Sequence, residues 1–185
     1  MRLLSLLIFI SLSTSAQQSY IDYISPYHPV VGRSGMVVSQ NNLSSDIGIE
    51  ILNKGGNAVD AAVAVGFSLA ITLPRAGNLG GGGFMLVYLK EKDEIFYIDY
   101  RSKSPLNSTI DNIFDLNGKT IKPKDFTNDM FDITRYGYKA PAIPGTVAGL
   151  LEAHENFGKL PLEEVLAPAI RQARNGIRVS YDLEK

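Results

Sequence analysis

The sequence contains no cysteine and no tryptophan, and among its 185 residues only His28 and His154 carry an imidazole. Without cysteine the chain cannot form disulfide bonds, use a thiol nucleophile or bind a metal through thiolates. Neither histidine lies in a Ser/His/Asp constellation that would support nucleophilic catalysis. We therefore predict no metal site and no cofactor in this chain.

The chain also lacks a strong charge of either sign. Its formal net charge is −1 and its pI is near 6.1, whereas nucleic-acid-binding domains usually carry a concentrated basic patch. We predict no nucleic-acid partner. Hydrophobic residues make up 45% of the sequence, which at this length is enough for one folded domain with a sizeable core.

The apolar run at the N-terminus is too short to span a bilayer as a helix, which takes about 20 residues. The dipeptide Met1-Arg2 precedes the apolar residues 3–12 and the small residues 13–16, an order typical of a secretory signal peptide. We expect residues 1–16 to be removed as a signal peptide and the protein to be exported to the periplasm or the extracellular space. An uncleaved membrane anchor is the alternative, but we expect no stable anchor.

The next segments lead into the core of the chain. Residues 17–35 contain prolines and aromatic residues without a periodic pattern, which predicts an extended lead-in. Residues 36–39 are interpreted as a short buried strand. The apolar positions 43, 47 and 51 then predict a helix, which Gly55 ends.

The rest of the chain is organised around residues 57–101. Between Ala58 and Ile71 nearly every residue is apolar and small, which predicts a helix covered by protein on all sides. Asn57 and Asp60 have the spacing of a capping box, so we interpret Asp60 as a helix cap rather than a catalytic acid.

The four glycines Gly80–Gly83 follow this helix. Such a run can cradle phosphate, form an oxyanion hole or allow two backbone segments to pack closely. The spacings of the known nucleotide-binding glycine motifs are absent, so we favour close packing. Phe84–Leu89 is apolar on both faces, as in a buried strand, and with the strand Ile95–Tyr100 it predicts a hairpin that places Arg101 near the sheet edge.

The second half of the sequence predicts an irregular segment and then helices. Residues 102–140 are polar and rich in turn residues, typical of a long surface segment. Residues 147–157 and 161–176 show helical periodicity, and His154 is expected at the surface near the end of the first of these helices. A helical turn starts at Tyr181, and because a single turn does not offset the cost of nucleation, we expect the chain to belong to a longer protein.

Four longer motifs follow one another in the sequence: Gly56–Ala62, Gly77–Met85, Asp99–Arg101 and Pro144–Gly149. Together they resemble the gamma-glutamyltranspeptidase (glutathione hydrolase) family. The resemblance covers residues 36–185 and only the N-terminal portion of that family's large subunit. It implies an α+β fold, namely the αββα sandwich of the N-terminal-nucleophile hydrolases, present only in part.

The resemblance also implies an activity. Members of the family are proenzymes that cut themselves into a large and a small subunit. They transfer a gamma-glutamyl group from glutathione or a related donor to water or an acceptor amine through an acyl-enzyme on a threonine. That threonine begins the small subunit and is expected beyond Lys185, so no threonine of this chain receives a catalytic role.

One substrate contact is expected within the chain. By similarity, Arg101 holds the alpha-carboxylate of the glutamyl group, which a planar guanidinium can grip through two parallel hydrogen bonds. Without the motif, an arginine at a strand end is usually a surface residue. The sequence departs from the family directly after this position, where Ser102–Pro105 replaces an acidic residue and an alanine before proline.

Two alternatives to gamma-glutamyl transfer stay open. The first is a non-catalytic, truncated secreted module that keeps only the first elements of the fold. The second is a related self-cleaving acylase of the cephalosporin acylase type.

Overall fold

The computed structural model describes residues 29–76, 78–112, 118–119, 137, 140–179 and 181–184. The chain divides into two units, Met1–Met36 and Val37–Lys185. In the first unit, the described residues 29–36 are exposed and form no helix or strand. The predicted signal peptide and His28 lie outside the described residues.

The described helices and strands all lie in the second unit. In chain order they are α2 (Asn42–Asn53), α3 (Ala58–Thr72), β1 (Phe84–Leu89), β2 (Glu94–Asp99), the 3-10 turn η1 (Ile110–Asn112), α4 (Thr146–Phe157), α5 (Leu162–Asn175) and α6 (Tyr181–Glu184). The helices and the hairpin stand where the sequence predicted them, and the α+β class is confirmed.

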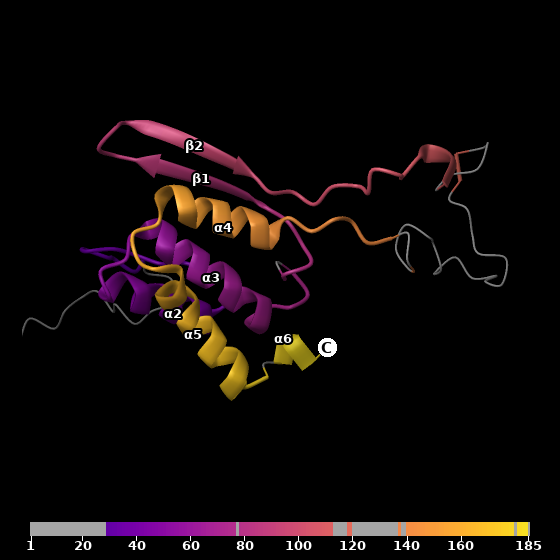
Figure 1. Cartoon of the computed structure of the whole chain (residues 1–185). Coiled ribbons are helices and arrows are strands. Elements are labelled where there is room, and N and C mark those ends of the chain that lie inside the picture. The colour runs from indigo at the N-terminus through magenta and orange to yellow at the C-terminus, as the bar shows by residue number, and fades with distance from the viewer. Residues whose placement is uncertain are drawn as a thin grey trace, which may run out of the picture. The chain divides into compact units, whose positions relative to one another are not determined.

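Helix α3 is the centre of this unit, since α2, α4 and α5 all pack against it. Figure 1 shows the hairpin and α4 on one side of α3, with α2 and α5 on the other. Val63 and Ala64 are fully buried, as expected for a core helix, whereas Ala62 is exposed. Among the described residues, α3 is therefore covered on most of its circumference but not all of it.

Hydroxyl groups join three of these helices inside the core. Ser44 Oγ of α2 lies 2.7 Å from Ser68 Oγ and 2.8 Å from Thr72 Oγ1, both on α3. Ser68 Oγ in turn donates to Gln172 Oε1 of α5 at 2.7 Å. Because each buried hydroxyl has a partner, this polar cluster is compatible with an otherwise apolar core.

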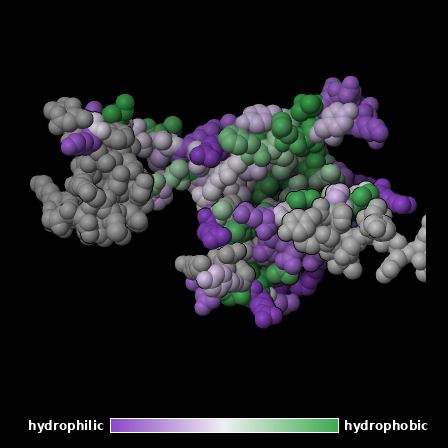
Figure 2. Space-filling view, turned by 180° about the vertical axis from the view of Figure 1, so that it is seen from behind, coloured by the Kyte–Doolittle hydropathy of each residue, from purple (hydrophilic) through white to green (hydrophobic). Residues whose placement is uncertain are grey.

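The hairpin buries only one of its faces. Strands β1 and β2 pair antiparallel, with Phe84 opposite Asp99. Val87 and Ile98 join the core, whereas large apolar side chains of the other face are exposed: Phe84, Leu86, Tyr88, Ile95 and Tyr97. Figure 2 shows hydrophobic surface gathered over this region.

Two predictions about buried strands are wrong for the described residues. Phe84–Leu89 is a strand but is not buried on both faces, because helices cover only its inner side. Residues 36–39 form no strand, and Met36 and Val38 are exposed. The apolar side chains of both segments led to the prediction of buried strands, but burial depends on which elements lie beside them.

Candidate functional site

Arg101 lies directly beyond β2, separated from it by Tyr100. Its side chain is exposed, and its backbone N–H donates to Asp99 Oδ1 at 2.9 Å. Within the described part of the chain, no carboxylate forms an ion pair with its guanidinium. The predicted place of Arg101 near the sheet edge is thus confirmed.

The glycine run lies against the backbone of the same segment. Gly83 and Tyr100 exchange two backbone hydrogen bonds of 3.3 and 3.1 Å, which extend the hairpin ladder by one pair. A Cβ on Gly82 would lie 2.4 Å from the Ser102 nitrogen and 2.9 Å from the Arg101 carbonyl carbon. Since no side chain fits there, the prediction of close backbone packing is confirmed for this glycine.

A third segment, Ile143–Gly149, closes on the other two. The carbonyl of Gly81 accepts hydrogen bonds from the N–H groups of Gly145 at 2.8 Å and Thr146 at 3.1 Å. Lys103 and Ile143 exchange two backbone bonds of 3.1 and 2.8 Å. Three of the motifs singled out in the sequence are therefore brought together around the backbone of Arg101.

Tyr100 is the residue on which these segments converge. A Cβ on Gly149 would lie 2.1 Å from the Tyr100 Cγ atom, and one on Gly83 would lie 2.8 Å from Cε2. The half-buried position raises the pKa of the Tyr100 phenol, because burial disfavours the charged form. Sequence reasoning missed this contact, although Gly145 before α4 and Gly149 in its first turns mark places where another segment can approach closely.

Two buried threonines differ in their surroundings. Thr72 Oγ1 forms a hydrogen bond with Ser44 Oγ and donates another to the Ser68 carbonyl oxygen. Thr146, the first residue of α4, is 5% exposed, and its Oγ1 has no hydrogen-bond partner within the described residues. Thr109 is exposed, and the other four, Thr14, Thr120, Thr127 and Thr134, lie outside the described residues. None was assigned a catalytic role from the sequence.

Asp60 is a helix cap, as predicted. Asn57 Oδ1 accepts from the Asp60 N–H, and Asp60 Oδ2 accepts from the Asn57 N–H, both at 2.9 Å. The same carboxylate is fully buried and also accepts from the backbone N–H groups of Lys159 and Leu160. It therefore ties the start of α3 to the connection between α4 and α5.

The prediction that His154 lies at the surface is wrong. Its side chain is only 15% exposed, and Nε2 lies 3.7 Å from Asp60 Oδ1. The same nitrogen is 2.9 Å from the Leu160 carbonyl oxygen. The connection between α4 and α5 folds back over the helix end, which covers a ring that the sequence pattern placed in solvent.

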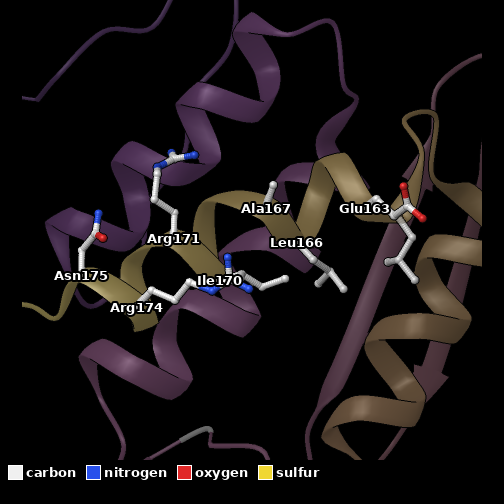
Figure 3. A pocket seen from close by; sticks show the side chains of 8 residues that line it. Glu163, Leu166, Ala167, Ile170, Arg171, Arg174 and Asn175 are labelled. Atoms are coloured by element: carbon white, nitrogen blue, oxygen red, sulfur yellow. The ribbon is translucent and has the colours of Figure 1, made fainter.

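Helix α5 presents a depression that is separate from this site. Figure 3 shows that its lining side chains all rise from α5, with Ile170 between Leu166 and Arg174. A single helix face offers no converging polar groups for a small ligand.

Among the described residues, no group of three or more His, Asp or Glu side chains could hold a metal ion. The helices in the described residues are all too short or too polar to span a bilayer.

Comparison with known proteins gives consistent matches. A family model described as Gamma-glutamyltranspeptidase matches residues 44–185. The chain is 43% identical over 154 residues to the glutathione hydrolase proenzyme of Escherichia coli (strain K12), which covers 83% of this chain and 25% of that protein. It is 39% identical over 159 residues to the acylase ACY 1 proenzyme of Pseudomonas sp. (strain V22), which covers 86% of this chain and 28% of that protein.

A solved structure matches in the same region. The crystal structure of Helicobacter pylori gamma-glutamyltranspeptidase has a TM-score of 0.74 and 38% sequence identity, and the match covers 84% of this chain and 42% of that one. The chain spans about a quarter of the length of the curated relatives it matches.

Proposed function

This chain belongs to the gamma-glutamyltranspeptidase family, and we propose that the protein transfers gamma-glutamyl groups from glutathione and related donors to water or to acceptor amines. The reaction passes through an acyl-enzyme on a threonine at the start of a small subunit, C-terminal to Lys185. Cleavage of a proenzyme produces this subunit, and the proenzyme names of the relatives support that step. The complete fold is then the αββα sandwich, to which this chain contributes α3, α4 and the hairpin.

Arg101 binds the alpha-carboxylate of the donor in this proposal. The observation that carries it is the exposed guanidinium, without an ion pair among the described residues, at the point where three sequence motifs converge. An arginine fork can form two parallel charge-assisted bonds with a carboxylate, which fixes the orientation of the ligand as well as its affinity. In the complete protein we propose that this site is partly desolvated, so removing the arginine would leave the carboxylate without its partner there.

The test is the kinetics of Arg101→Ala and Arg101→Lys in the complete gene product. Losing the partner of a buried charge costs on the order of 2–5 kcal/mol, so kcat/KM of the alanine variant should fall by roughly 30- to 5,000-fold. The lysine variant keeps the charge but loses the fork, so it should not restore full activity. Arg174→Ala, at an arginine beside the depression on α5, is the matched control and should keep wild-type kinetics.

The donor separates carboxylate recognition from a general defect. A donor that lacks the alpha-carboxylate should be used about equally by wild type and Arg101→Ala. If the variant still favours the complete donor as strongly as wild type does, Arg101 is not in the site. Self-cleavage into two subunits, followed on a gel, should survive in the variant because the exposed side chain contributes little to the core.

A related acylase is the second candidate, and the similarity to acylase ACY 1 proenzyme favours it. An acylase and a gamma-glutamyltransferase differ in the acyl group that they accept. Assaying the complete protein with a gamma-glutamyl anilide and with a cephalosporin acyl donor separates the two. Turnover of the cephalosporin alone would favour the acylase, and turnover of neither would favour a non-catalytic module.

Export is also proposed, on the order of charged, apolar and small residues in 1–16. The protein would then meet its gamma-glutamyl donors in the periplasm or the extracellular space.

A further inference from the structure

We propose that Tyr100, held by Gly145 at the N-cap of α4 and by Gly149 within α4, is a positioning residue that sets the direction of the Arg101 side chain and so the preference for donors with an alpha-carboxylate. This inference rests on the proposed role of Arg101. It adds the contact between Tyr100 and Gly149 as a second determinant of donor specificity. Gly149 lies on α4, which follows Arg101 in the sequence by more than forty residues.

Both the ring and the carbonyl group of Tyr100 are confined. A Cβ on Gly149 would lie 2.1, 2.2 and 2.4 Å from Cγ, Cβ and Cδ1 of Tyr100, so the glycine hydrogen faces the base of the ring. A Cβ on Gly145 would lie 2.1 Å from the Tyr100 carbonyl oxygen. That same oxygen accepts the Gly83 N–H at 3.3 Å. Neither glycine can be enlarged without moving Tyr100 or α4.

The confined carbonyl group of Tyr100 is joined to the Arg101 nitrogen by the peptide bond, so it fixes where the Arg101 backbone begins. Beyond the pair formed by Gly83 and Tyr100, the strand ladder ends, and the exposed Arg101 side chain has little packing of its own. The Arg101 backbone is anchored after this residue by the Lys103–Ile143 bridge and before it by Tyr100, so a shift of Tyr100 turns the Arg101 side chain against a fixed end. A bidentate grip on a carboxylate requires the guanidinium plane to meet the ligand in one orientation, and a displacement of about 1 Å can cost about 100-fold in rate.

The phenol oxygen contributes less than the ring. Its contact with the Phe84 carbonyl is 3.5 Å long and exposed, at the limit of a hydrogen bond. Tyr100→Phe keeps the ring in place and should behave like wild type. Tyr100→Leu removes the aromatic ring from between the glycines and should release the Arg101 backbone.

The experiment measures donor discrimination, defined as kcat/KM for a gamma-glutamyl anilide divided by kcat/KM for the same anilide without the alpha-carboxylate. In the complete gene product, Gly149→Ala and Tyr100→Leu should each lower this ratio by about tenfold or more. Tyr100→Phe should preserve it. A loss of active protein alone changes both rate constants equally and leaves the ratio unmoved.

Gly66→Ala provides the matched control, because it lies in the contact between α3 and α4 but away from Tyr100. A Cβ there would lie 2.8 Å from Leu150 Cδ1, the far end of a flexible side chain. This variant should lower stability or yield slightly and keep the discrimination ratio of wild type.

The outcomes separate this inference from the proposed function. If Arg101→Ala removes discrimination while Gly149→Ala and Tyr100→Leu both retain it, the positioning role is wrong and the role of Arg101 stands. If Arg101→Ala itself retains discrimination, the proposed function of Arg101 fails. Should Gly149→Ala yield no folded protein, Tyr100→Leu compared with Tyr100→Phe decides the question, since neither adds an atom to the crowded contact.

Discussion

Replacing Asp60 with asparagine tests how strongly one buried carboxylate holds the connection between α4 and α5. The carboxylate is fully buried and accepts from the backbone N–H groups of Asn57 at 2.9 Å, Lys159 at 3.0 Å and Leu160 at 3.3 Å. Asparagine has nearly the same shape, but it carries no charge and replaces one acceptor oxygen with a donor.

The expected cost follows from these three bonds. A hydrogen bond to a charged group contributes about 1.5–3 kcal/mol and a neutral one about 0.5–1.5 kcal/mol, so each bond should weaken by about 1 kcal/mol. The bond from Asn57 lies within the cap of α3, so opening of the connection between α4 and α5 is affected by the other two bonds only. Their total is about 2 kcal/mol, which corresponds to a change of about 30-fold in the opening equilibrium. Because the affected bonds are local, we expect the loss to appear first where Lys159 and Leu160 meet the cap.

Amide hydrogen exchange in the complete gene product measures this directly. The Lys159 and Leu160 amides should exchange about 30-fold faster in Asp60→Asn than in wild type. The control is Glu50→Gln, which breaks ion pairs with Lys54 and Arg171 at a partly exposed site. Exposed pairs contribute about 1 kcal/mol or less, and these lie on another part of the unit. Equal exchange at Lys159 and Leu160 in the two variants would refute the reasoning.

Three further predictions concern pH, activity and processing. The pKa of Glu50 is lowered, chiefly by the hydrogen bond from Lys54; its contribution to stability is therefore present above the ordinary value of 4.5 and is lost as the pH falls through the lowered folded value. Glu50→Gln should accordingly weaken the acid dependence of the thermal midpoint, and an unchanged acid limb would contradict this assignment. The isolated 185-residue chain should not turn over a gamma-glutamyl anilide and should aggregate through the exposed face of the hairpin; turnover, or a monodisperse species in light scattering, would show otherwise. Mass spectrometry of exported protein should find Gln17 at the mature N-terminus, and an intact Met1 would overturn the signal-peptide prediction.

Local signals in the sequence were sufficient to place most helices. The Asn57 and Asp60 spacing predicted the cap of α3, and Gly158 ends α4 as expected. These features depend on residues within one or two turns, so a linear pattern records them. The position of Arg101 after β2 was likewise a local consequence of the hairpin.

Contacts between distant segments could not be predicted in the same way. The strand β1 is apolar on both faces, but which face is covered depends on α3 and α4. His154 becomes half-buried because a later turn folds over it. The contact of Tyr100 with Gly149 joins residues from two different elements, and the sequence records only that each position lies in a motif. The sequence motifs therefore identified the parts of the candidate site but not how they support one another.

The two-way bridge between Lys103 and Ile143 has a consequence for how this protein can diverge. The bridge joins the two ends of the stretch of chain between Lys103 and Ile143. The entropy lost when two ends of a chain are joined grows only with the logarithm of the number of residues between them. Doubling that number costs only about 0.6 kcal/mol. A change in the number of residues between Lys103 and Ile143 should therefore cost little free energy at the bridge itself, so relatives can differ in length here and still keep this backbone pair.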